Sequence, residues 1–162
     1  ALVSLGCTPA EMTWKAGVDI LSLGATKNGA MASEAVILFP SARDRLPQLL
    51  ANQKRAGLML PKIRYVSAQM AAWLKDDLWL DLARTANAAA KRLSEGLSAV
   101  DGAELVHPTH GNEVFIRLED ALAARLREAG AGFYSWPDGS ARFVASWCTT
   151  DADISALLDA AG

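Results

Sequence analysis

Residues 18–39 read VDILSLGATKNGAMASEAVILF and place two apolar segments on either side of a turn that carries one lysine. The first segment, Val18 to Leu23, has the length and apolar content of a strand that is buried on both faces. Glu34 to Phe39 has the same character and is a second candidate strand. Because Gly24 to Gly29, GATKNG, breaks the first segment with a turn, Lys27 is predicted to stand directly after a buried strand.

Lys27 is the first candidate for chemistry. A lysine on a glycine-flanked turn with small neighbours has little freedom to move, and its surroundings are expected to be partly desolvated. Desolvation lowers the pKa of a lysine and leaves a neutral, nucleophilic amine, which Schiff-base chemistry requires. The spacing alone equally permits a solvated loop lysine, so both interpretations stay open at this point.

The segments on both sides of this stretch have helical patterns. Thr8 to Gly17 opens with Thr-Pro-Ala-Glu, which predicts Thr8 as the N-cap of a short helix with a capping box. Arg43 to Ala56 is also helical, with Pro47 as a break or a helix start. Two helices or one bent helix are predicted for Ile63–Leu74 and Leu78–Leu97, with Asp76 or Asp77 as N-cap of the second.

The last third of the chain alternates between strand and helix patterns. A strand, a helix, two strands and a final helix are predicted, over Glu113–Leu118, Glu119–Ala129, Gly132–Trp136, Ala141–Trp147 and Asp151–Ala161. Pro137 to Ser140 is a hairpin-type turn between the two strands. The order β-α-β-β-α predicts a small α+β unit after a long helical connector, and the whole chain is expected to be α/β.

Composition narrows the class of protein. The 162 residues are 51% hydrophobic and 21% charged, as in a soluble globular domain or a piece of a larger one. Sixteen basic residues against 18 acidic ones give a net charge of −2, which argues against nucleic acid or an anionic membrane as partner. Cys7 and Cys148 are predicted to be reduced thiols of a cytosolic protein. With His107 and His110 they show no metal-ligand spacing, so no metal site is expected.

Ser22 to Gly29, SLGATKNG, resembles the lysine segment of the low-specificity L-threonine aldolases, which are pyridoxal-phosphate enzymes of fold type I, the aspartate-aminotransferase-like fold. The resemblance continues through SAQM at residues 67–70, DDLW at 76–79 and RFV at 142–144. It implies that residues 1–75 are the remainder of a large cofactor-binding domain. Residues 76–100 would be a connector helix, and residues 101–162 a small C-terminal α+β domain.

The resemblance also implies roles for individual residues. Lys27 would form the Schiff base with pyridoxal 5'-phosphate, and Thr26 beside it would contact the cofactor. Arg142 would bind the α-carboxylate of the substrate with its forked guanidinium, a task suited to arginine. The alternative for Arg142 is an edge-strand arginine paired with a nearby carboxylate such as Asp138.

A basic patch surrounds Gly57 and Pro61. Lys54, Lys62 and Arg64 are candidates to reach the cofactor phosphate of a neighbouring subunit, as the resemblance implies, and Arg55 lies among them. Some relatives carry an arginine about where this chain has Pro61, so Lys62 or Arg64 would take over that position. The alternative is an ordinary solvated surface.

The function expected from the resemblance is a cytoplasmic lyase that cleaves threonine and related β-hydroxy-α-amino acids to glycine and an aldehyde, acting as a homodimer or homotetramer. In this family the aspartate that pairs with the pyridine nitrogen belongs to a D-G-A-R segment upstream of the matched residues, and Asp19 is not that aspartate. The chain is therefore expected to be an incomplete C-terminal segment, inactive alone. Another lyase or transferase of the same fold, or a non-catalytic fragment without cofactor, remain the alternatives.

Overall fold

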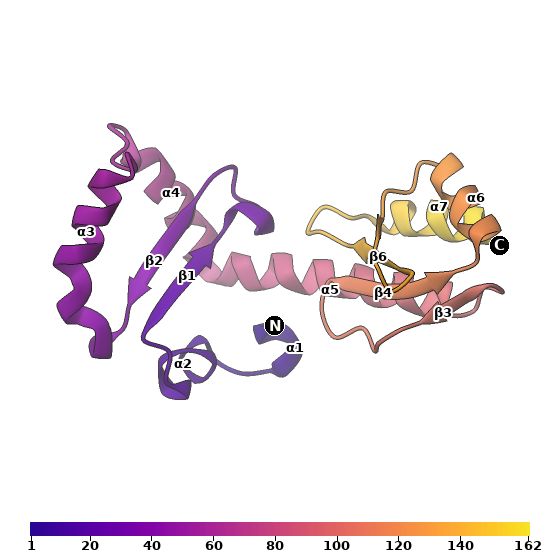
Figure 1. Cartoon of the computed structure of the whole chain (residues 1–162), viewed down its shortest axis with the longest axis horizontal. Coiled ribbons are helices and arrows are strands. Elements are labelled where there is room, and N and C mark those ends of the chain that lie inside the picture. Colours follow the sequence, from indigo (N-terminus) through magenta and orange to yellow (C-terminus); the bar gives the residue numbers. More distant parts are fainter. The chain divides into compact units, whose positions relative to one another are not determined.

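In the computed structural model, which describes residues 1–162, the chain divides into two compact units. One contains Leu2–Asp81, and the other contains Ala1 and Leu82–Gly162. Figure 1 labels the helices and strands of both units.

The N-terminal unit pairs two strands and surrounds them with short helices. Its elements are α1 (Leu2–Leu5), α2 (Pro9–Met12), β1 (Ile20–Gly24), β2 (Glu34–Leu38), α3 (Leu46–Arg55) and α4 (Ile63–Leu74), with 3₁₀ helices at Trp14–Ala16, Thr26–Asn28, Pro40–Arg45 and Lys75–Asp77. The predicted capping box of α2 is confirmed, because Thr8 Oγ1 accepts a hydrogen bond from the Glu11 amide and the Thr8 amide donates to Glu11 Oε2. The α-helix itself ends at Met12, before the predicted end at Gly17.

The strands β1 and β2 form an antiparallel pair. Leu21 pairs with Ile37, and both side chains are half-buried, whereas Ile20 and Val36 on the opposite face are 44% and 53% exposed. The prediction of strands buried on both faces is therefore wrong for this structure. The physical reason is that successive side chains of a strand point to opposite faces, and this two-stranded sheet is covered on only one of them.

The helices predicted after the second strand are present. Pro47 lies in the first turn of α3, so the helix start predicted there is confirmed. The break between α4 and α5 (Leu78–Leu97) is also confirmed, at Lys75–Asp77. Asp76 and Asp77 have left-handed backbones, with φ of 52° and 59°. An N-cap residue normally has an extended backbone, so the prediction of either aspartate as N-cap of α5 is wrong.

The C-terminal unit is built on an antiparallel sheet with the strand order β3-β4-β6-β5. After most of α5, its elements are β3 (Ala103–Leu105), β4 (Glu113–Leu118), α6 (Asp120–Glu128), β5 (Tyr134–Ser135), β6 (Ser140–Val144) and α7 (Asp151–Ala161). β4 and α7 have the predicted bounds, and β5 and β6 are shorter than predicted. β3 was missed, because its three residues are too few to show an alternating pattern.

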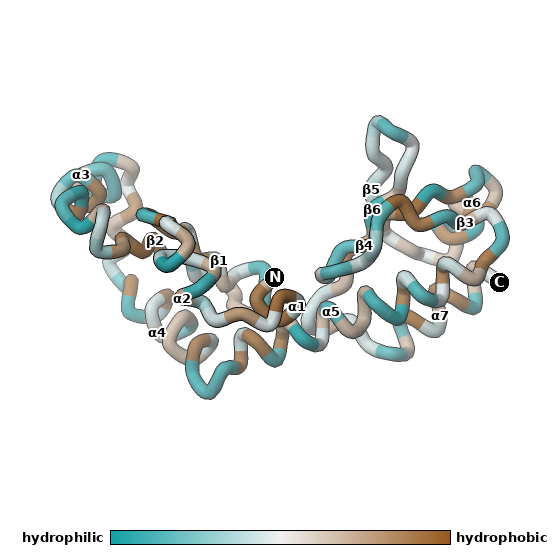
Figure 2. Tube along the Cα trace, turned by 90° about the horizontal axis from the view of Figure 1, so that it is seen from below, coloured by the Kyte–Doolittle hydropathy of each residue, from teal (hydrophilic) through white to brown (hydrophobic).

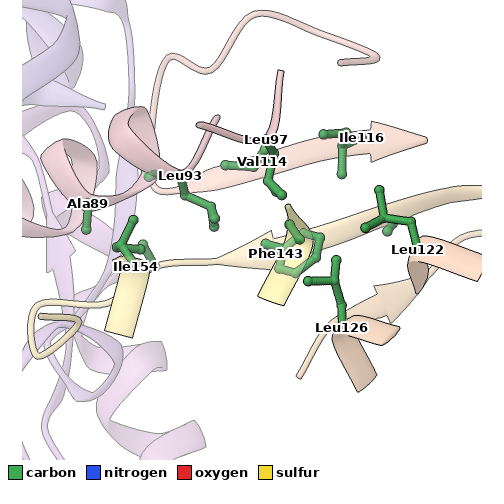
Figure 3. Close-up of a cluster of buried hydrophobic side chains, with 13 residues drawn as sticks. Ala89, Leu93, Leu97, Val114, Ile116, Leu122, Leu126, Phe143 and Ile154 are labelled. Carbon is green, nitrogen blue, oxygen red and sulfur yellow. The ribbon is translucent and has the colours of Figure 1, made fainter. Parts of the chain in front are cut away.

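One face of this sheet carries the core of the unit. Side chains of β4 and β6 pack there against residues of α5, α6 and α7, as Figure 3 shows for Val114, Phe143, Leu97, Leu126 and Ile154. Hydrophobic and hydrophilic residues alternate along α5 (Figure 2), as expected of a helix with one buried side. The segment expected to be a connector therefore supplies part of the core of the C-terminal unit.

Candidate functional site

Lys27 lies on a short 3₁₀ helix, Thr26–Asn28, that directly follows β1. The turn begins at Ala25, which is fully buried and whose amide donates to the carbonyl of Ser33 at 2.9 Å. Thr26 Oγ1 accepts from the amide of Ser33 at 3.0 Å, so the two ends of the β1–β2 loop are joined twice. Gly29 closes the turn with a φ of 108°, in a region that residues with a Cβ rarely adopt.

Asn28 fastens this turn to the helices that follow in the chain. Its Nδ2 donates to the carbonyl of Trp79 at 2.9 Å, and its own carbonyl accepts from Trp73 Nε1 at 2.8 Å. Trp73 is buried, and the two tryptophan rings lie 5.5 Å apart. These contacts were not predicted from the sequence. The available signal was the indole N–H, which needs an acceptor when the ring is buried.

The other end of the β1–β2 loop is held by α4. Ser33 is buried and its hydroxyl donates to the carbonyl of Val66 at 3.0 Å. The amide of Ala32 donates to Gln69 Oε1, also at 3.0 Å. Gln69 belongs to the SAQM segment, so this stretch of the chain acts as a support for the lysine loop.

The side chain of Lys27 is exposed, and the prediction of a partly desolvated lysine is wrong for this structure. The turn is anchored through its backbone and through Asn28, and its small neighbours do not cover the lysine. Lys27 forms no ion pair and no side-chain hydrogen bond. The result is an unpaired amine at the end of a backbone that is fixed on several sides.

Gly24, the last residue of β1, lies beside the side chain of Glu34, with which it pairs across the two strands. A Cβ atom built at Gly24 would lie 2.4 Å from Oε2 of Glu34. Because this oxygen is the end of an exposed, flexible side chain, a small residue at position 24 would only turn the carboxylate aside.

Arg142 lies in the C-terminal unit, on β6, where its neighbours across the sheet are Phe115 and Tyr134. Its Nη1 donates to Oε1 of Glu113 at 3.3 Å. Of the alternative predicted for Arg142, the pairing with a nearby carboxylate is confirmed, with Glu113 as the partner. The edge-strand position is wrong, since β6 lies between β4 and β5. Asp138 is not its partner either: hydrogen bonds from the Ser140 hydroxyl and amide lower the pKa of Asp138.

Two aromatic rings flank the guanidinium of Arg142. Its central carbon lies 5.1 Å from the ring centre of Tyr134 and 5.5 Å from that of Trp136, within the range of cation–π attraction. The Trp136 ring in turn lies 6.0 Å from Phe115. Nε of Arg142 is buried and has no hydrogen-bond acceptor. Glu113, Tyr134 and Trp136 were not predicted as neighbours of Arg142, although the alternation of side chains along paired strands places them there.

The predicted basic patch is fully exposed. Lys54 and Arg55 end α3, Lys62 precedes α4, and Arg64 lies in the first turn of α4. Arg55 donates to Asn52 Oδ1 at 3.1 Å, and the guanidinium of Arg64 lies 4.8 Å from the ring centre of Tyr65. None of the four forms an ion pair with a carboxylate, so the patch presents uncompensated positive charge.

The histidines, the cysteines and the apolar helices are further candidate features of the sequence, and the structure places them as follows. No group of three or more His, Cys, Asp or Glu side chains is arranged to hold a metal ion. His107 lies beside the ring of Phe115, with 6.2 Å between the ring centres. Cys7 and Cys148 are free thiols. None of the helices combines the length and the apolar content that crossing a membrane requires.

Comparison with known proteins adds relatives that match almost the whole chain. A low specificity L-threonine aldolase of Pseudomonas aeruginosa is 40% identical over 162 residues, 99% of this chain. A second, from a Pseudomonas species, is 39% identical over 158 residues, 97% of this chain. These matches confirm the resemblance that the lysine segment indicated. The chain spans 45% of the length of each of these relatives. No family model matches the chain.

Solved structures give the same result for the fold. A threonine aldolase of Leishmania major aligns with a TM-score of 0.72 and 28% identity, over 88% of this chain and 42% of its own. An ornithine aminotransferase of Plasmodium yoelii aligns with a TM-score of 0.51 and 12% identity, over 89% of this chain and 39% of its own. The second likeness is one of fold alone. The mixed α/β fold expected from the sequence is thus shared with both enzymes.

Proposed function

We propose that the protein carrying this chain is a pyridoxal-phosphate-dependent lyase that cleaves threonine and related β-hydroxy-α-amino acids to glycine and an aldehyde. The observation that carries the proposal is the unpaired amine of Lys27 on a turn that Ser33, Trp73 and Trp79 hold in place. The relatives named as low specificity L-threonine aldolases support it.

The residues present fit the cofactor at its point of covalent attachment. Nζ of Lys27 is free of ion pairs and accessible, so it would hold the aldehyde carbon of pyridoxal phosphate. When bound, this cofactor supplies a ring that accepts the electron pair released as the Cα–Cβ bond of the substrate breaks. Lys54, Lys62 and Arg64 are the cations that we propose for the cofactor phosphate, in a neighbouring subunit.

Thr26 stays a proposed cofactor contact, with one restriction. Its hydroxyl donates to the carbonyl of Ser33 and accepts from the Ser33 amide. A hydroxyl has a single proton to donate, so Thr26 cannot donate to a phosphate while this bond is intact. We therefore assign Thr26 first to holding the lysine turn.

Arg142 is the proposed binding group for the α-carboxylate of the substrate. A guanidinium presents parallel N–H donors that match the two oxygens of a carboxylate, and the flanking rings of Tyr134 and Trp136 limit its movement. Cleavage also requires that the β-hydroxyl lose its proton. We assign that step to water or to a group outside the residues of this chain.

The proposed setting is a homodimer or homotetramer in the cytoplasm. A role of the basic patch at a neighbouring subunit requires such an assembly, and two free thiols are compatible with a reducing compartment.

The test is the cleavage of threonine by the whole protein that carries this chain, supplied with pyridoxal phosphate. Glycine and an aldehyde should form in equal amounts, and Lys27→Ala should reduce the rate to background because the amine that holds the cofactor is gone. Lys15→Ala is the matched control, since Lys15 is another exposed lysine of the same unit. Turnover of threonine without release of glycine, or full activity of Lys27→Ala, would contradict the proposal.

A further inference from the structure

Arg142, the proposed binding group for the substrate carboxylate, already forms an ion pair with the carboxylate of Glu113. Glu113 and Arg142 lie on neighbouring strands, where Glu113 pairs with Val144 and Phe115 pairs with Arg142. The two side chains therefore lie diagonally on the same sheet face, and Glu113 Oε1 is 3.3 Å from Arg142 Nη1. Their side chains are 42% and 27% exposed, so this pair is partly shielded from water.

The guanidinium has two edges on which a carboxylate can bind through both oxygens. One edge joins Nε to a terminal nitrogen, and the other joins Nη1 to Nη2. Nε is buried and has no acceptor, and the rings of Tyr134 and Trp136 flank the group, so solvent does not reach the first edge. The remaining edge includes Nη1, the atom that Glu113 contacts. A bidentate ligand must therefore compete with Glu113.

Two carboxylates at one guanidinium also repel each other, which adds to the competition. We infer that Glu113 is a resident counter-ion that holds Arg142 in place and is displaced when a carboxylate ligand binds. Glu113 thereby sets the affinity of the site for carboxylates, and it is a positioning residue that acts through Arg142. This inference rests on the proposed role of Arg142 in binding the substrate carboxylate. It adds a role for Glu113, which the proposed function does not involve.

Tyr134 and Trp136 also hold Arg142 in place. Because the two rings contact the guanidinium independently of Glu113, they can keep Arg142 aligned while Glu113 leaves. The exchange then requires movement of one glutamate side chain rather than of the sheet. The half-exposed carboxylate of Glu113 has water to move into.

The experiment is a titration of the 162-residue chain with sodium acetate, followed by NMR on the arginine Nε–H signals, with sodium chloride at equal ionic strength as reference. Arg142→Lys identifies the signal of Arg142 by its loss. Acetate should shift this signal in the wild-type chain. In Glu113→Gln, which keeps the shape but removes the charge, we expect half-saturation at about fivefold lower acetate, equivalent to about 1 kcal/mol.

Glu104→Gln is the matched control. Glu104 is an exposed glutamate of β3 that pairs with Arg117, so it lies on the same sheet face without contacting Arg142. It should leave the acetate affinity unchanged. Glu113→Asp, which keeps the charge on a shorter side chain, should give an intermediate affinity and serves if Glu113→Gln does not fold.

The possible outcomes distinguish the role of Glu113 as a counter-ion from the role of Arg142 as a carboxylate site. Equal acetate affinity of the wild type and Glu113→Gln, with the Arg142 signal shifting in both, overturns the role of Glu113 and leaves Arg142 as a carboxylate site. An equal gain in Glu104→Gln also overturns it, because the effect would then be general electrostatics. No shift of the Arg142 signal in any variant overturns the proposed role of Arg142 and the inference with it.

Discussion

The two units of the chain hold their candidate residues by different means. In the C-terminal unit, Arg142 stands on the outer face of a sheet whose inner face packs Leu97, Ile116 and Leu126 in full burial. In the N-terminal unit the residues that are buried are small or isolated: Ala25, Ser33, Ala42 and Trp73. Lys27 is instead positioned by hydrogen bonds between its loop and α4, which includes Trp73, and by one from the loop to the carbonyl of Trp79.

The apolar core of the C-terminal unit mainly stabilises that unit, whereas the hydrogen bonds of the N-terminal unit mainly position Lys27. Apolar burial stabilises a unit but is non-directional, whereas hydrogen bonds fix a direction at little net gain in stability. The N-terminal unit also exposes large apolar side chains, among them Met31, Val36, Leu50, Leu58 and Met59. Substitutions in the two units should therefore differ in what they disturb.

The largest expected effect is on the stability of the C-terminal unit. Leu126→Ala removes a fully buried side chain and leaves a cavity, so the free energy of unfolding should fall by about 2–5 kcal/mol. Leu50→Ala is the matched change in the N-terminal unit, where the side chain is 53% exposed, and should cost less than about 0.5 kcal/mol. Hydrogen exchange at the Val114 and Ile116 amides measures the loss of unfolding free energy in Leu126→Ala. Equal small effects of both changes would contradict the comparison.

A smaller effect is expected at the lysine turn. Trp73→Phe keeps an aromatic ring but removes the Nε1–H that donates to the carbonyl of Asn28, at a cost of about 1 kcal/mol. The loss should appear as faster hydrogen exchange at the Asn28 and Ala30 amides, with the C-terminal unit unaffected. Trp14→Phe, at a half-exposed ring of the same unit, is the control. Unchanged exchange in Trp73→Phe would show that the tryptophan does not hold the turn.

The smallest expected effect concerns two matching helix caps, one in each unit. Hydrogen bonds from the Thr150 hydroxyl and amide lower the pKa of Asp153, and those from the Thr8 amide and hydroxyl lower the pKa of Glu11. Thr150→Ala removes one donor, so the pKa of Asp153 should rise toward its ordinary value while that of Glu11 stays unchanged. NMR titration of the two side-chain carboxyl carbons measures both.

The sign of the linked stability follows from these directions. A carboxyl whose pKa is lower in the folded state stabilises the fold above its unfolded pKa, and the contribution disappears as the pH falls through the folded pKa. Thr150→Ala should therefore reduce the stability of the C-terminal unit at neutral pH, and the difference from the wild type should shrink in acid. A difference that stays constant with pH would exclude the carboxyl as its source.

Local chemistry in the sequence predicted much of this structure. Thr8 and Pro47 mark helix starts through a cap and a restricted φ, and such signals act within a few residues. The same locality made Lys27 recognisable on its turn. What the sequence did not predict depends on contacts between distant residues. Asn28 meets Trp79 across 51 positions, and Arg142 meets Glu113 across 29.

The exposure of Lys27 and of the β1–β2 pair also depends on contacts between distant residues, so the sequence did not predict it. An apolar segment such as residues 18–23 predicts a strand with two covered faces, but which faces are covered is decided by the neighbours that the chain brings to it. In this structure only one face has them. Composition and periodicity carry no information on that point.

Reduction of the whole protein carrying this chain with borohydride, after pyridoxal phosphate is added, tests directly whether Lys27 holds the cofactor. Peptide mapping then locates the lysine that retains the cofactor. We expect a single modified lysine, Lys27, and no stable modification in Lys27→Arg. Modification at Lys54 or Lys62 instead, or none at all in the wild type, would contradict it.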